Sequence, residues 1–107
     1  MAKDGTFLGL KVHTVANLGA YLSNYGPFIP TMAGTGMLAG LYSTPAIHAH
    51  IVGVFTHTVP IDAYRGAGRP EAAYLIERMM DAAAFDLGID GAELRRKNFA
   101  PESAMPY

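Results

Sequence analysis

The sequence of 107 residues contains no cysteine, which excludes a disulfide framework, a thiolate metal site and a cysteine nucleophile. An excess of basic residues is also missing, because eight Lys and Arg residues face nine Asp and Glu residues and the net charge is -1. Without a positive field the chain does not attract nucleic acid, so nucleic acid is not an expected partner. The lack of cysteine fits a reducing compartment, and we expect a cytoplasmic location.

Charge is absent from the long stretch between Lys11 and Asp62, which holds fifty residues without Asp, Glu, Lys or Arg. Prolines, histidines, glycines and an asparagine interrupt this stretch, so it does not predict a membrane span. The first ten residues, MAKDGTFLGL, also lack the pattern of a secretory signal. An isolated domain of this size normally exposes much charged surface. The neutral stretch therefore predicts segments that are covered by protein outside this chain.

The N-terminal pattern predicts a tight turn followed by a strand. Asp4 and Gly5 form the pair typical of a two-residue hairpin turn, and Leu8, Leu10 and Val12 alternate as on one strand face. Only three residues precede the turn, so we expect that the partner strand of the hairpin is missing and that the chain starts inside a fold. A frayed polar start is the alternative interpretation.

A second strand is predicted over residues 46–59, AIHAHIVGVFTHTV, because this segment is rich in β-branched residues and ends at a proline. Before it, the apolar, glycine-rich segment 32–41 predicts a short buried helix. Its GTGMLAG motif has the wrong spacing for a dinucleotide-binding turn and lacks the Lys-Ser or Lys-Thr pair of a P-loop. We therefore expect Gly34, Gly36 and Gly40 to serve packing.

The clearest predicted element is a helix from Pro70 to Leu87. Proline suits the first helical turn, and Gly88 supplies the stop. Apolar residues at helical spacing predict a buried stripe: Ala72, Leu75, Ile76, Met79, Met80, Ala83 and Leu87.

A shorter helix is predicted to follow. Asp90, with Glu93 three residues later, resembles a capping box, and the cations at 95–97 suit the negative end of the helix dipole. The predicted fold is α+β, with strands in the N-terminal half, then a loop, then a long and a short helix.

Two of the four histidines raise the question of a metal site. His48 and His50 share one face of the predicted strand, and only His13 or His57 could supply a third imidazole. Because no third ligand is defined, we favour ordinary hydrogen-bonded histidines over a metal site.

The loop AYRGAGRPE, residues 63–71, predicts an oxyanion site. A strand, a glycine-rich turn and a helix start would point several backbone amides at one spot, with the positive end of the helix dipole behind them. Gly66 and Gly68 allow a ligand to approach the backbone, and Arg65 and Arg69 add planar donors. The alternative interpretation is a tight connection with two solvated arginines.

The run TVPIDAYRGAGRPEAAYLIERMMDAAAFDLGIDGAELRRKNF, Thr58 to Phe99, resembles the molybdenum-binding large subunit of the xanthine dehydrogenase and aerobic carbon monoxide dehydrogenase family. The segments AKDGTFLGLKVHTVANLGAYLSNYGPFIPT and NFAPESAMPY resemble the same family. The resemblance covers nearly the whole chain. It implies that residues 1–107 are a middle portion of the molybdopterin-binding domain, truncated at both ends.

The loop differs from two known versions in this family. In carbon monoxide oxidisers it reads Ala-Tyr-Arg-Cys-Ser-Phe-Arg, and the cysteine holds copper; here Gly66 stands at that position, which argues against carbon monoxide oxidation. In purine-oxidising relatives a phenylalanine stacks on the substrate; here Ala67 stands there, which argues against purine specificity. The Gly-Ala-Gly version resembles the form II, carbon monoxide dehydrogenase-like proteins.

The resemblance implies the roles of the loop residues. Arg65 and Gly66 would lie beside the molybdenum centre, and Ala67 and Gly68 would line the substrate cavity. The implied cofactor is molybdenum-molybdopterin cytosine dinucleotide in the full-length protein, with none expected for the isolated chain.

The resemblance also implies what acts beside this chain. The implied reaction is hydroxylation with oxygen from water, and the glutamate that acts as base lies beyond Tyr107. The implied partners are the rest of the large subunit, an iron-sulfur small subunit and an FAD medium subunit. We expect the isolated chain to catalyse nothing; the alternative is a small non-enzymatic module that binds an anion or a partner.

Overall fold

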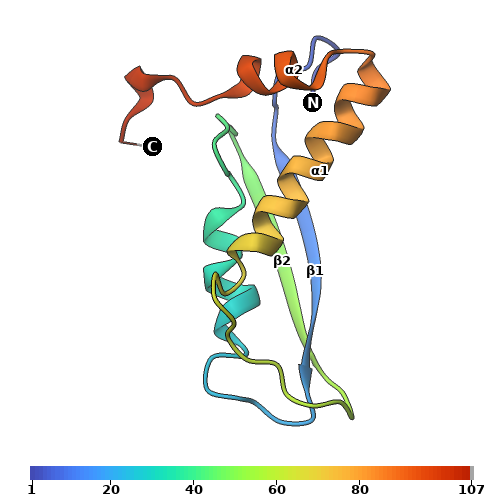
Figure 1. Ribbon diagram of the computed structural model, residues 1–107, viewed down its shortest axis with the longest axis vertical. Coiled ribbons are helices and arrows are strands. Elements are labelled where there is room, and N and C mark those ends of the chain that lie inside the picture. Colours follow the sequence, from blue (N-terminus) through green and yellow to red (C-terminus); the bar gives the residue numbers. More distant parts are fainter. Residues whose placement is uncertain (107) are drawn as a thin grey trace.

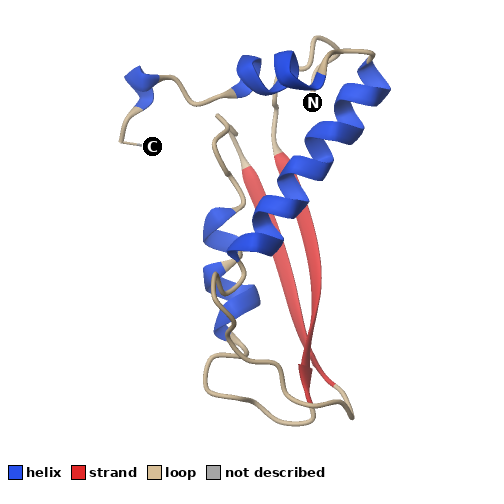
Figure 2. Ribbon diagram, in the orientation of Figure 1, coloured by secondary structure: helices blue, strands red, loops and turns tan. Residues whose placement is uncertain are grey.

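The computed structural model describes residues 1–106 and has an α+β fold, as predicted. Two strands, β1 (Leu10–Gly19) and β2 (Ile47–Phe55), lie beside the long helix α1 (Arg69–Leu87), and the short helix α2 (Gly91–Asn98) crosses one end of the sheet (Figures 1 and 2). None of the helices in this part of the chain has an apolar run long enough to cross a bilayer.

β1 and β2 form a parallel two-stranded sheet in which Leu10 pairs with Ile47 and His13 with His50. Because side chains alternate along a strand, the buried residues Val12, Ala16 and Leu18 share the face of β1 that α1 covers. The predicted strand is therefore confirmed, but it begins at Leu10. Leu8 lies before the strand and is exposed, so the prediction that it shares a strand face with Leu10 and Val12 is wrong.

The connection between the strands does not contain the predicted buried helix over residues 32–41. Instead it forms a π-helical turn (Ile29–Ala33) and a 3₁₀ turn (Thr35–Met37). Of this segment only Leu38 is buried. The physical reason is its composition, since repeated glycines after a proline disfavour a continuous α-helix.

α1 confirms the predicted helix almost to the residue. Gly88 ends it with a φ of 65°, and its amide donates to the carbonyls of Ala84 and Phe85. The buried residues are spaced four apart: Ala72, Ile76, Met80 and Ala84. Met79, which was predicted to be buried, is 53% exposed. A sheet of two strands covers only a narrow strip of the helix, so apolar residues at the edge of the predicted stripe, such as Met79, are exposed to solvent.

α2 begins at the predicted cap. The Asp90 carboxylate Oδ1 accepts hydrogen bonds from the amides of Ala92 and Glu93, both at 3.0 Å. Leu94 and Asn98 are the buried residues of this helix.

The N-terminal segment is held against α2. The Ala2 amide donates to the Thr6 carbonyl at 2.9 Å, and the Gly5 amide donates to the Ala2 carbonyl at 3.0 Å. A tight turn therefore forms as predicted, but it contains three residues, Lys3, Asp4 and Gly5, and not only the predicted pair. The buried Asn98 side chain donates to the Gly5 carbonyl and accepts from the Phe7 amide. The alternative of a frayed start is therefore wrong, and the turn contacts a helix.

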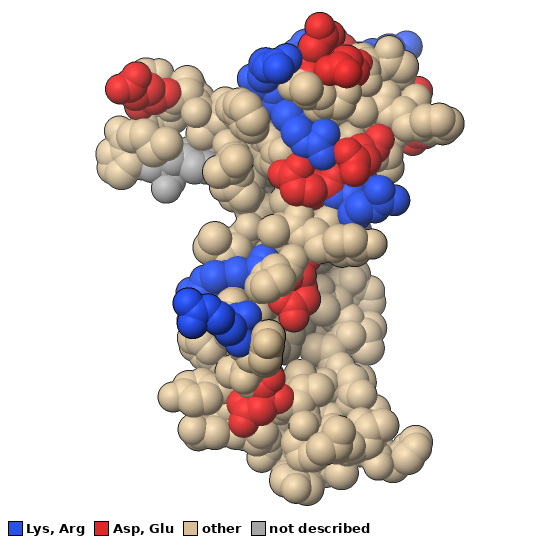
Figure 3. All heavy atoms as spheres, viewed as in Figure 1, with Lys and Arg blue, Asp and Glu red and all other residues tan. Residues whose placement is uncertain are grey.

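The core consists of two small clusters, which contain Phe7, Tyr42, Ile76, Met80, Ala84 and Leu94, and Val12, Leu38 and Ala72. The radius of gyration is 15.9 Å, larger than the roughly 13 Å typical of a compact domain of this length. Many large apolar side chains are exposed, and one end of the molecule carries almost no charge on the face drawn in Figure 3. This shape supports the expectation that other protein covers the chain.

Candidate functional site

The loop before α1 has an unusual backbone. Gly66, Ala67 and Gly68 have φ angles of 98°, 39° and 91°, so three consecutive residues lie in the left-handed region. Glycine adopts this region without steric cost, whereas alanine does so at a cost on the order of 1 kcal/mol. The loop therefore holds Ala67 in a strained conformation between two relaxed residues.

The amides of this loop divide into two groups. The Ala67 amide donates to the Tyr64 carbonyl at 2.8 Å, and the Arg69 amide donates to the Gly66 carbonyl at 3.0 Å. The expectation that the loop amides converge on a ligand is therefore wrong for these two, because short turns satisfy their own donors first. Within the described residues, the amides of Gly66 and Gly68 have no hydrogen-bond partner.

The segment before the π-helical turn holds the start of the loop. Ser23 Oγ donates to the Ile61 carbonyl and accepts from the Gly26 amide. Asp62 Oδ1 accepts from the Ala63 amide at 2.7 Å and from the Tyr25 amide at 3.3 Å. Sequence analysis did not identify Ser23 or Asp62, because these contacts join residues that lie 37 and 38 positions apart.

Gly68 also packs directly against the π-helical turn. A Cβ atom on Gly68 would lie 2.8 Å from the Gly34 nitrogen and from the Ile29 carbonyl oxygen. A Cβ atom on Gly34 would lie 3.2 Å from the Gly68 carbonyl oxygen. The predicted packing role is thus confirmed for Gly34, but it is wrong for Gly36, where a Cβ atom would meet nothing within 4 Å. The close approach at Gly68 is to protein backbone, not only to a possible ligand.

A hollow of about 330 Å³ opens beside the loop. Three of the predicted site residues, Arg65, Ala67 and Gly68, line it, whereas Gly66 lies in the same loop but not among the lining residues. Ile29, Asp62, Tyr64, Pro70 and Glu71 complete the lining. A second hollow of about 210 Å³ shares Ile29, Gly68 and Glu71 and is otherwise largely apolar.

The charges around the first hollow are mixed. Arg65 is the only cation of its lining, and Asp62 and Glu71 are carboxylates. The Asp62 carboxylate already accepts two amides, which leaves Glu71 as the negative group without a described partner. Any affinity for an anion must therefore come from Arg65 and the unpaired amides of Gly66 and Gly68 before α1. Sequence analysis missed Glu71 as a lining residue, although its place in the RPE motif at the helix start was visible.

The histidines do not form a three-ligand site. The rings of His13 and His50 stack, with centroids 5.0 Å apart and planes inclined by 11°. Within residues 1–106, no group of three or more His, Cys, Asp or Glu side chains is arranged to hold a metal ion.

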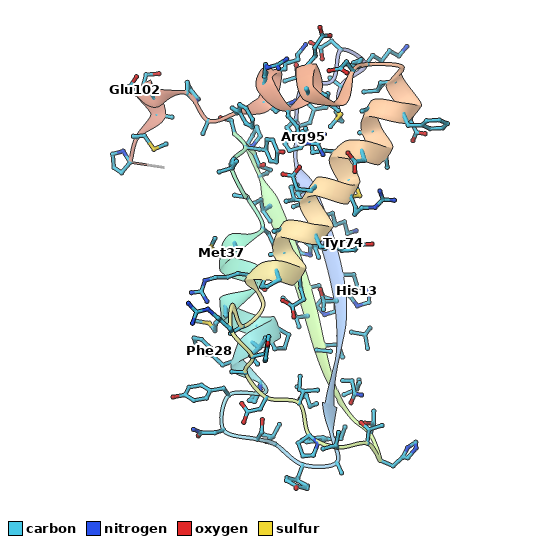
Figure 4. The ribbon with its side chains drawn as sticks, viewed as in Figure 1. His13, Phe28, Met37, Tyr74, Arg95 and Glu102 are labelled. Carbon is cyan, nitrogen blue, oxygen red and sulfur yellow. The ribbon has the colours of Figure 1, made fainter. Side chains whose placement is uncertain are left out.

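The strongest pKa shifts lie elsewhere, in an ionic cluster that joins the two helices. Arg95 donates to Glu77 Oε2 and Asp81 Oδ1, both at 2.8 Å, and Tyr42 Oη donates to Glu77 Oε1 at 2.6 Å (Figure 4). Burial, followed by the neighbouring Glu77 carboxylate, raises the pKa of Tyr42 to about 12. The Tyr42 hydroxyl and then Arg95 lower the pKa of Glu77. None of these groups lines the hollow, so the cluster is structural.

The chain is similar to known molybdenum proteins. The profile of the family described as molybdopterin cofactor-binding domain matches residues 1–99. The chain is 41% identical over 106 residues to the carbon monoxide dehydrogenase large chain of Hydrogenophaga pseudoflava. It is 34% identical over 104 residues to subunit gamma of the 6-hydroxypseudooxynicotine dehydrogenase complex of Paenarthrobacter nicotinovorans. Each alignment covers 97% of this chain and 13% of the relative, so the chain spans about 13% of the length of these curated relatives.

Solved structures share the fold. Quinoline 2-oxidoreductase from Pseudomonas putida 86 superposes with a TM-score of 0.88 and 31% identity, over 98% of this chain and 14% of that one. The Cu,Mo-CO dehydrogenase superposes with a TM-score of 0.83 and 33% identity, over 100% of this chain and 14% of that one. These matches confirm both the resemblance stated from the sequence and the α+β fold.

Proposed function

Because this chain belongs to the molybdopterin cofactor-binding domain family, we propose that it is a middle portion, truncated at both ends, of a molybdenum hydroxylase large subunit. The observation that carries the proposal is the left-handed run at residues 66–68, which leaves two unpaired amides beside a hollow lined by Arg65. The similarity to large subunits over nearly the whole chain supports it.

The loop suits such a cofactor because it has hydrogen-bond donors and no side chain that would bind the metal directly. The amides of Gly66 and Gly68 can donate to oxygen or sulfur atoms, and Arg65 adds a guanidinium. The loop has no thiolate or imidazole, which suits a metal that is held by its organic cofactor and not by side chains. When bound, a molybdenum-molybdopterin cytosine dinucleotide cofactor accepts two electrons while oxygen from water is added to the substrate.

The residues of this chain would then position the reactants. Arg65 and Gly66 would hold the cofactor, and Ala67 and Gly68 would line the substrate pocket. The methyl group of Ala67 leaves space and offers no aromatic face for stacking, so the pocket would accept an aldehyde, an N-heterocycle or a similar small molecule without purine specificity. Carbon monoxide oxidation is not proposed, because Gly66 provides no thiolate for copper.

Neither proton transfer nor electron transfer is assigned to this chain. The glutamate that acts as base would lie in the part of the subunit beyond Tyr107, so the isolated chain would be inactive and hold no cofactor. Electrons would pass to an iron-sulfur small subunit and an FAD medium subunit in the cytoplasm. The printed names of the relatives, a large chain and a complex subunit gamma, support a multi-subunit enzyme.

Sequencing the DNA on both sides of the reading frame tests this proposal. We expect coding sequence for the rest of the large subunit, including the base glutamate, with genes for the two partner subunits nearby. The large subunit purified with these partners should contain molybdenum and cytosine dinucleotide, whereas the 107-residue chain should contain neither. Flanking DNA that encodes none of these parts would contradict the proposal.

The ordered N-terminal turn favours a second candidate, a small module that binds an anion or a partner without catalysis. Asn98 and Lys97 hold this turn, so the start of the chain needs no further strand to be ordered. A chain that stays a soluble monomer at all concentrations would favour the module. A chain that self-associates with rising concentration would exclude it.

A further inference from the structure

One face of the sheet carries a group of basic side chains. Lys11 and His13 on β1 pair in register with His48 and His50 on β2, and all four residues are exposed. Their side chains share one face because residues two apart on a strand point the same way. We call these four residues the basic sheet face. His13 is labelled on β1 in Figure 4.

No carboxylate balances the basic sheet face. Neither β1 nor β2 contains Asp or Glu, and within residues 1–106 none of the four side chains has a described hydrogen bond or ion pair. α1 packs on the opposite face of the sheet, where Ala72 contacts the cluster containing Val12. The charged residues of α1 therefore lie on the other side of the sheet from the four basic groups.

The stacked histidines favour an anionic partner over a metal ion. A metal ion must lie near the plane of each imidazole ring that binds it, and the planes of His13 and His50 are nearly parallel, at 11°. The two lone pairs therefore do not converge on one point. A carboxylate, by contrast, has two oxygens and accepts an N–H from each of two neighbouring rings.

We propose that the basic sheet face binds an acidic, extended segment from the rest of the large subunit, with carboxylates at alternate positions. Same-face residues repeat about every 6.6 Å along a strand, and carboxylates at alternate positions of an extended segment have the same spacing. The occupant follows from charge complementarity and from the relatives, in which most of the subunit lies outside this chain. This inference rests on the proposed function.

Fluorescence anisotropy with labelled twelve-residue peptides tests the proposal on the 107-residue chain. The probes are an alternating Glu-Thr peptide and its Gln-Thr analogue, each measured at pH 6 and pH 8. We expect the Glu-Thr peptide to bind at pH 6 roughly tenfold more tightly than the Gln-Thr peptide, because only the Glu-Thr peptide carries the negative charge that complements this face. High salt should weaken the Glu-Thr complex.

Substitutions assign the binding to this face. The His13→Gln and His50→Gln double variant should weaken binding at pH 6, and Lys11→Gln should weaken binding at both pH values. The matched control is His57→Gln, which changes an exposed histidine outside β2 and should bind like the wild type.

Several results would overturn the proposal: equal affinity for the two peptides, no binding of the Glu-Thr peptide at either pH, or loss of binding in His57→Gln. Zinc binding that depends on His13 and His50, without peptide binding, would assign the pair to a metal instead. The sequence of the flanking DNA distinguishes a failure of the proposed function from a failure of the inference about the basic sheet face. If it encodes the rest of the subunit and the peptide does not bind, only the inference about the sheet face fails.

Discussion

Gly68 shows how a single residue is constrained by the backbone of a distant segment. Its φ of 91° is unfavourable for any side chain, and a Cβ atom would collide with the backbone of Ile29 and Gly34. Backbone atoms cannot rotate away as a flexible side chain can. The glycine is therefore required by packing, whether or not a ligand binds beside it.

Substituting Gly68→Ala should consequently lower the free energy of unfolding by about 2–3 kcal/mol. Gly36→Ala is the matched control, because its Cβ atom would meet nothing within 4 Å and its φ is not in the left-handed region. Urea unfolding monitored by circular dichroism measures both variants. A similar loss in the two variants would contradict the packing explanation.

Asp4 and Lys97 form a surface pair whose effect depends on pH. The hydrogen bond from Lys97, followed by the amide of Thr6, lowers the pKa of Asp4 from 3.8 to about 2. A carboxyl group with a lowered pKa in the folded state contributes stability above its unfolded pKa and loses it as the pH falls through its folded pKa. The contribution of this pair should therefore disappear between about pH 4 and pH 2.

We expect Lys97→Met to reduce the urea midpoint at pH 6 but to leave a smaller difference from the wild type at pH 2. Glu77 and Asp81 also have lowered pKa values, so both proteins should lose stability in acid, and only their difference reports on Asp4. Lys3→Met removes a neighbouring exposed lysine and serves as the control. A Lys97 effect that is constant with pH would contradict the assignment.

One arginine links the two helices through several polar contacts. Arg95 lies on α2 and reaches two carboxylates of α1, Glu77 and Asp81, while one of its nitrogens donates to the Glu77 carbonyl (Figure 4). A single planar guanidinium thus joins α2 to α1, beside the buried contact of Leu94 with the apolar residues of α1.

Replacing Arg95→Met should destabilise the chain by about 1–2 kcal/mol, a range that allows for the partial exposure of the partners. Arg96→Met is the matched control, because Arg96 is exposed and has no described partner. Thermal unfolding of both variants measures the effect. An equal loss in Arg96→Met would mean that the cluster does not join the helices.

Over the whole molecule, many large apolar side chains are exposed to solvent, whereas the buried core is small. Val59 is 81% exposed and Tyr21 is 67% exposed, both in the half of the chain that carries no charge. Patches of this kind normally contact other protein. The extended shape of the chain and its small share of the relatives' length support the proposal that the rest of a large subunit covers this surface.

The isolated chain should therefore self-associate through its uncharged half. Sedimentation velocity should give a weight-average coefficient that rises with concentration, and Tyr21→Lys with Val59→Lys should reduce this rise. Phe85→Lys is the control, since Phe85 is 87% exposed but lies on α1 in the charged half. A monodisperse monomer at all concentrations would contradict the prediction.

The sequence by itself determined the local features of this protein, namely the bounds of α1, its stop at Gly88, the cap at Asp90 and the family that the loop at residues 63–69 resembles. These features depend on residues within a few positions of one another, whose preferences are intrinsic. Only the tertiary structure decided which amides of the loop stay unpaired, why Gly68 must be glycine, that Met79 is exposed and that His13 meets His50. Each of these features depends on contacts between segments that lie far apart in the chain. Local residue spacing and composition do not reveal such contacts.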